Sequence, residues 1–180
     1  MILLRALRTA ALALAACAVL AAGAVQARAQ TVDDILKRGK VRIGVLIGAP
    51  PYGSIDAEGK PVGYDADVAN LVAKYLGVPI EMVPLTPPAR IPALESGKAD
   101  FLIATLAPTA ERAKTVMFTI PYSTFQMGIW AKKGEAIKAW ADLRGKRVGV
   151  NRGSSVEIEL TKREKELNLS ISRFEDDSTT

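Results

Sequence analysis

The sequence predicts an α/β fold built on a parallel sheet. Three short apolar runs, at residues 41–47, 80–83 and 101–104, have the length and composition of buried strands. Between these runs lie stretches whose apolar residues recur with the spacing of a helix, and glycines mark the ends of these stretches. Strands that alternate with short helices favour parallel pairing through right-handed crossovers.

A short helix precedes the first strand. We expect it at residues 32–37, with Thr31 as its N-cap and Gly39 at its end. The strand that follows must stop in a loop, because Pro50 and Pro51 remove two backbone donors from the sheet and restrict the residues before them.

Tyr52 leaves the carboxyl end of this first strand. An aromatic ring at such a place is either a flat wall against a ligand or a cover for the end of the sheet, and the residues alone leave both open. Residues 55–60 are predicted to form a hairpin-like turn that contains Gly59.

The second helix is predicted to begin near Asp65 and to end at Gly77. Either Asp65 or Asp67 is expected to cap it. These two carboxylates lack the further oxygen ligands that a divalent cation requires, so we expect no metal ion there.

A turn and a third, short helix connect the second strand to the third. The turn is expected at residues 86–89 and the helix at 90–95. Ile91 and Leu94 have the spacing to face the core from this helix.

Polar groups gather just beyond the third strand. Thr105, Thr109 and Arg112 follow its end, which is where ligands bind in open α/β sheets. The alternative is that Thr109 caps a helix and that Arg112 belongs to an ordinary solvated first turn.

A second α/β unit follows a stretch of β character at residues 125–131. We place the crossing between two domains at this stretch, which predicts domains at residues 30–125 and 126–180. In the second domain we expect a helical turn, a strand, a helix and another strand, at residues 140–143, 147–150, 155–167 and 171–174.

Gly153, Ser154 and Ser155 join a strand to a helix in this second unit. Backbone donors at the start of a helix lie at the positive end of its dipole, which suits a carboxylate. The plainer interpretation is a serine N-cap with Glu157 in the first turn, and both interpretations stay open at this point.

The N-terminal residues have the layout of a signal peptide. Two arginines precede an uncharged apolar run at residues 9–25, and a small-residue cleavage site follows at Ala29. We therefore predict a periplasmic protein with a signal peptide at residues 1–29. Cys17 formally fits a lipoprotein cleavage box, but the site after Ala29 is better placed.

Composition excludes several classes of function. Three of the 24 basic residues lie in the signal peptide, which leaves 21 basic residues against 19 acidic ones. No basic cluster with interleaved aromatic residues is present, so we expect no nucleic acid partner. The chain has no histidine, the commonest general base and metal ligand, and we expect no cofactor.

Several stretches together carry a family resemblance. They are residues 50–52, 63–67, 90–94, 96–100, 105–112, 121–122, 142–150 and 153–157. In this order and spacing they resemble the amino-acid-type (family 3) extracellular solute-binding proteins of ABC importers. The resemblance covers nearly all of residues 40–160.

The resemblance implies a type II, periplasmic-binding-protein-like clamshell whose two lobes close on a ligand. Arg112 would then pair with the α-carboxylate of an amino acid through a two-pronged contact. Ser154 and Ser155 would bind the same carboxylate from the other lobe. Thr105 would accept a hydrogen bond from the α-ammonium group, and Tyr52 would flank the ligand's side chain.

The sequence departs from the family pattern at several positions. Ala107 stands where the family usually offers a hydroxyl, and it leaves only a backbone donor. Leu46 and Ala49 replace the acid and the aromatic residue that binders of basic amino acids tend to carry, which disfavours a lysine- or arginine-type ligand. Pro87 lies near the usual place of an aromatic wall, so we expect a less polar pocket.

The resemblance also implies partners and alternatives. We expect a monomer that captures an amino acid or a similar small carboxylate for an ABC permease in the inner membrane. The family's second lobe needs roughly a hundred more residues, so an incomplete second lobe is expected. A dehydratase acting on a cyclohexadiene acid and the sensor domain of a membrane receptor are the alternatives.

Overall fold

The computed structural model describes residues 31–177 and 179–180. The predicted signal peptide at residues 1–29, its cleavage site and Cys17 lie outside the described residues. Within the described ranges, no helix has the length and apolar character needed to cross a membrane.

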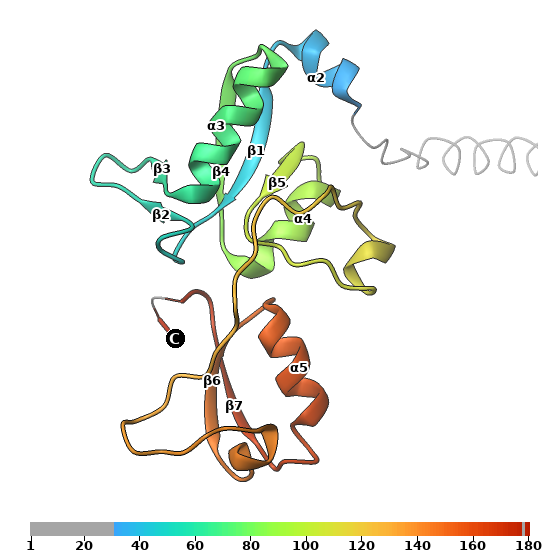
Figure 1. Cartoon of the computed structure of the whole chain (residues 1–180). Helices are drawn as coiled ribbons and strands as arrows, with labels where there is room; N and C mark the ends of the chain where they lie inside the picture. The colour runs from blue at the N-terminus through green and yellow to red at the C-terminus, as the bar shows by residue number, and fades with distance from the viewer. Residues whose placement is uncertain (1–30, 178) are drawn as a thin grey trace, which may run out of the picture.

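A parallel sheet of three strands forms the first α/β unit (Figure 1). Its strands are β1 (Val41–Leu46), β4 (Ile80–Leu85) and β5 (Phe101–Ile103), in the order β4-β1-β5. Ile43 on the central strand lies beside Met82 on one side and Phe101 on the other. The predicted strands and their parallel pairing are confirmed.

Helices cover both faces of this sheet (Figure 1). On one face, α3 (Tyr64–Leu76) packs Ala69 and Ala73 against the valines and isoleucine of β1. On the other face, α4 (Arg90–Glu95) packs Ala93 against β4. The α4 face is tightly filled: a Cβ added to Gly44 would lie 2.6 Å from side-chain atoms of both Leu85 and Leu102.

Short elements connect these layers as predicted. Helix α2 (Val32–Arg38) has Thr31 as its N-cap, and the left-handed residue Gly39 ends it. The expected turn joins β2 (Ser54–Ile55) to β3 (Pro61–Val62), and the 3-10 helix η1 (Pro87–Ala89) precedes α4.

The second α/β unit has two parallel strands and one helix. Strand β6 (Arg147–Asn151) pairs with β7 (Ser170–Phe174), and the 3-10 helix η3 (Trp140–Leu143) and helix α5 (Ser155–Arg163) precede and follow β6. Their core holds Leu143, Val150, Leu160, Leu167 and Leu169.

Helix α5 is shorter than the predicted 155–167. Residues 164–168 form turns instead, and Asn168 has a positive φ of 49°, which a continuing helix does not allow. This turn folds Leu167 and Leu169 into the core beside Leu160. Burial of these leucines therefore outweighs the helical tendency of the segment.

Residues 125–131, whose composition has β character, form no strand in the structure. They pair with no strand among the described residues. A strand needs a partner for its backbone donors and acceptors, and here several apolar side chains are exposed, Met127, Ile129 and Trp130 among them.

Candidate functional site

Arg112 lies where the two units meet. Its side chain is buried, with 8% of its surface exposed. Nη1 donates to the Ala107 carbonyl at 2.8 Å, on the loop that follows β5, and to Ser155 Oγ at 3.1 Å. Nη2 donates to the Gly153 carbonyl at 2.8 Å. One guanidinium thus bridges the loop after β5 and the start of α5.

The start of α5 follows the plainer of the two interpretations. Ser154 is its N-cap, and the Ser154 hydroxyl accepts a hydrogen bond from the Glu157 amide at 3.0 Å. Glu157 in turn accepts from the Gly153 amide at 2.6 Å. Among the described residues, no acceptor faces the amides of Ser155 and Val156, so these are the donors that remain at this helix start.

Replacing Ser154 with alanine should lower the free energy of unfolding by about 1 kcal/mol, because the N-cap acceptor is lost. Aspartate at this position keeps an acceptor and should restore most of the loss. Urea denaturation of the three proteins measures the effect. A Ser154→Ala variant as stable as the wild type would contradict the capping role.

Arg90 is a second buried arginine at the same junction, and the sequence prediction missed it. Its exposed fraction is 4%. Its guanidinium donates to four backbone carbonyls at 2.9–3.0 Å, and these belong to Pro87, Ala104, Thr105 and Gly153. The prediction instead turned Ile91 and Leu94 inward, and both are only half-buried.

Two guanidinium groups therefore converge on the Gly153 carbonyl. Neither Arg90 nor Arg112 forms an ion pair with a carboxylate of the described residues. Burial, followed by the charge of Arg112, lowers the pKa of Arg90 to about 10, and burial lowers the pKa of Arg112. The junction thus holds two buried cationic groups, although the charges of Asp65 and Asp177 raise the pKa of Arg90 in opposition to its burial.

Asp65 corrects another expectation. It does not cap α3, because Gly63 is the N-cap residue and makes no side-chain bond. Asp65 is instead 1% exposed and accepts hydrogen bonds from the Thr105 hydroxyl at 2.7 Å and the Tyr122 hydroxyl at 3.0 Å. Burial raises the pKa of Asp65, although both hydrogen bonds and the charge of Arg90 oppose that rise.

Thr105 is half-buried and has a positive φ of 49°. Its hydroxyl donates to Asp65, but its oxygen keeps lone pairs that can accept. The Arg90 guanidinium binds the Thr105 carbonyl, so Arg90 connects this residue to the junction at Gly153. The proposed contact with an ammonium group stays a prediction.

Tyr52 lies in an aromatic cluster. Its ring is 6.3 Å from that of Tyr64 and 5.8 Å from that of Phe125, and Tyr64 stacks on Tyr122. These contacts fit the cover for the sheet end, and the ligand-flanking role stays a prediction.

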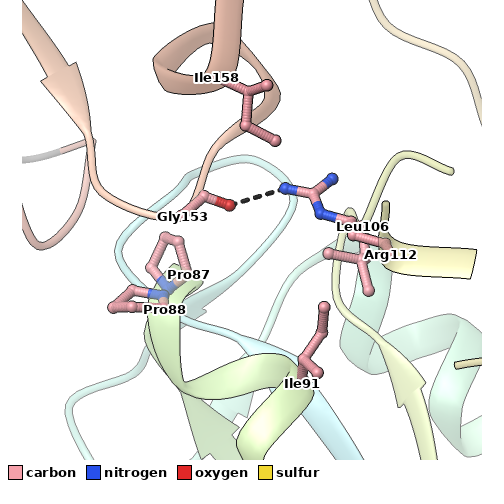
Figure 2. A pocket seen from close by; sticks show the side chains of 7 residues that line it. All are labelled: Pro87, Pro88, Ile91, Leu106, Arg112, Gly153 and Ile158. Atoms are coloured by element: carbon pink, nitrogen blue, oxygen red, sulfur yellow. Dashed lines mark hydrogen bonds between the residues drawn. The ribbon is translucent and has the colours of Figure 1, made fainter. Parts of the chain in front are cut away.

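A cavity of about 170 Å³ lies beside Arg112. Figure 2 shows the Arg112 side chain pointing across it to Gly153, with Ile158 of α5 on one side and Pro87 and Pro88 on the other. Ile91 and Leu106 complete the largely apolar lining. The volume is below the roughly 300–1,000 Å³ of sites for drug-sized molecules.

Comparisons with known proteins agree on one family. A model of the bacterial extracellular solute-binding proteins, family 3, matches residues 41–179. The glutamate/aspartate import solute-binding protein of Escherichia coli is 33% identical over 170 residues, which cover 89% of this chain and 56% of that protein. The chain spans about half the length of the curated relatives that it matches.

Solved structures are similar over most of the chain. The solute receptor for L-cysteine of Neisseria gonorrhoeae has a TM-score of 0.76 and 34% identity, with 84% of this chain and 62% of that chain covered. An ancestral amino acid-binding protein, a precursor of cyclohexadienyl dehydratase, has a TM-score of 0.71 and 34% identity, with 83% and 67% covered. The predicted two-lobed α/β fold class is confirmed.

Proposed function

The chain belongs to the bacterial extracellular solute-binding proteins of family 3, and from this premise we propose that it captures an amino acid between its two α/β units. The observation that supports the proposal most is the position of Arg112. This buried guanidinium reaches Gly153 and Ser155 from the opposite unit, and it has no carboxylate partner among the described side chains.

The α-carboxylate of the amino acid would lie between Arg112 and the start of α5. Arg112 supplies a planar pair of donors, which matches the geometry of a carboxylate. The Ser155 hydroxyl and the first-turn amides of α5 supply donors from the other side, where the helix dipole also favours negative charge.

Such sharing explains how binding would close the cleft. A ligand shifts an equilibrium only by its difference in affinity for the two states, and a carboxylate held from both sides gains most in the closed state. Each charged hydrogen bond contributes about 1.5–3 kcal/mol. Two such bonds therefore favour closure by about a hundredfold or more.

We extend the proposal to the cellular role, by analogy with the family. The protein would act as a monomer in the periplasm and deliver its amino acid to an ABC permease in the inner membrane. The signal peptide at residues 1–29 would direct its export. Leu46 and Ala49 disfavour a basic amino acid as the ligand.

We favour binding without turnover as the function of the site. An enzyme is the second candidate, because one similar structure is an ancestral precursor of a dehydratase. General acid–base chemistry needs a positioned proton donor or acceptor. The chain has no histidine, and Asp65 is already bonded to two hydroxyls.

Isothermal titration of the full chain with each of the twenty standard amino acids tests the proposal. We expect saturable binding of at least one of them with one site per chain, and NMR should recover that amino acid unchanged. The absence of binding to all twenty would overturn the proposal, and the appearance of a product would favour the enzyme.

A further inference from the structure

Thr105 is held in a conformation that its residue type disfavours. A positive φ is uncommon for a β-branched residue, and such strain persists only where the surroundings impose it. Here the Thr105 amide donates to Tyr122 Oη at 3.3 Å, its carbonyl accepts from Arg90 at 3.0 Å, and its hydroxyl donates to Asp65 at 2.7 Å. All its polar groups are fixed.

The bond to Asp65 also decides how the Thr105 hydroxyl can act. A hydroxyl has one proton to donate and two lone pairs that accept. Asp65 accepts that proton on Oδ2, while its Oδ1 accepts from Tyr122. The hydroxyl of the half-buried Thr105 therefore has only acceptor lone pairs left for any further group that approaches it.

We propose that Asp65 is a positioning residue that sets the polarity of the Thr105 hydroxyl, so that Thr105 accepts from an ammonium group and rejects a ligand that lacks one. This inference rests on the proposed function and adds a basis for selectivity. A site built to receive a donor discriminates strongly against an analogue without it, because the buried acceptor is then left unpaired.

Asp65→Asn tests the inference, because asparagine has one acceptor oxygen. If this oxygen accepts from Tyr122, the amide nitrogen faces Thr105 and donates to its hydroxyl, which then turns its own proton toward the cleft. We expect the preference for an ammonium-bearing ligand to fall at least about tenfold. Asp67→Asn is the matched control, since Asp67 is exposed on the same helix.

The readout is a ratio of two affinities, which a merely structural role would not change. The tightest binder among the twenty amino acids is compared with the acid that lacks only its α-amino group, for example L-glutamate with glutarate. Thr105→Val, which removes the hydroxyl at similar volume, should lower the ratio as Asp65→Asn does. If Asp65→Asn does not fold, an unchanged ratio in Thr105→Val still overturns the inference, because the hydroxyl that Asp65 orients is then not needed.

Acidification gives a second signature in the wild type. Protonation of Asp65 removes an acceptor, so the ratio should fall as the pH drops through its raised pKa, and Asp65→Asn should show no such change. Among the groups that face Asp65, Arg90 and Tyr122 titrate far above this range. The free energy of unfolding changes with pH in the opposite direction to the affinity ratio. The folded state binds the Asp65 proton more tightly than the unfolded state does, so the contribution of Asp65 to the free energy of unfolding falls as the pH rises through that pKa.

The outcomes separate the inference from the proposed function. Equal ratios for the wild type, Asp65→Asn and Thr105→Val would overturn the inference while the binding function stands. A wild type that binds none of the twenty amino acids would overturn both. A lower ratio in both variants, with Asp67→Asn unchanged, supports the inference.

Discussion

Replacing Arg112 with alanine is expected to weaken the binding of the tightest amino acid at least about a hundredfold. Two charged hydrogen bonds to the α-carboxylate are lost, and each contributes about 1.5–3 kcal/mol. Arg112→Lys keeps the charge but loses the planar pair of donors, so we expect it to recover only part of the affinity. Titration calorimetry measures all three proteins.

Arg152→Ala is the matched control for this prediction. Arg152 lies on the loop before α5, and its side chain is exposed and pairs with Glu175 at the surface. Its removal should change affinity little, since exposed ion pairs contribute about 0–1 kcal/mol. Full affinity in a folded Arg112→Ala protein would contradict the assigned role of Arg112.

Replacing Gly153 with alanine should disturb the contact between η1 and the loop before α5. A Cβ at this position would lie 3.0 Å from Pro88 Cα and 3.2 Å from the Pro87 carbonyl oxygen. These are backbone atoms, so they cannot rotate away as a side chain would. The backbone of η1 and Gly153 must therefore move apart by a few tenths of an ångström, which lengthens the hydrogen bonds from Arg90 and Arg112 to the Gly153 carbonyl. We expect amino acid binding to weaken at least about tenfold.

Gly145→Ala provides a control with the same backbone cost. Gly145 has a φ of 71° and Gly153 a φ of 73°, but a Cβ at Gly145 would meet no atom within 4 Å. Both variants therefore include the left-handed penalty of about 1 kcal/mol, and only Gly153→Ala adds the contact. Equal binding by the two variants would show that the close approach has no part in ligand capture.

Much of the fold was predictable because its signals are local. Each of these signals is contained in a short stretch of sequence. They are the apolar runs of β1, β4 and β5 and the glycines that end the helices. The parallel order of the strands follows from chain connectivity. Arg112 and Ser155 are in hydrogen-bond contact, since the loop after β5 meets the start of α5, and the carboxylate that they would share stays a prediction.

The misses share a physical cause, which is that distant partners decide them. Asp65 has the sequence position of a helix cap, but it is buried because hydroxyls 40 and 57 residues away bind it. Arg90 resembles a surface residue in the sequence, but in the fold four carbonyls from three segments accept hydrogen bonds from its guanidinium. Residues 125–131 have the composition of a strand, yet pairing also requires a partner strand.

A double-mutant cycle between Arg112 and Ser155 is the most direct test of a carboxylate shared by the two units. The affinity of the tightest amino acid is measured for the wild type, Arg112→Ala, Ser155→Ala and the double variant. If both side chains hold one carboxylate, the two losses should be non-additive by about 1 kcal/mol or more. Losses that add within about 0.3 kcal/mol would contradict the shared site.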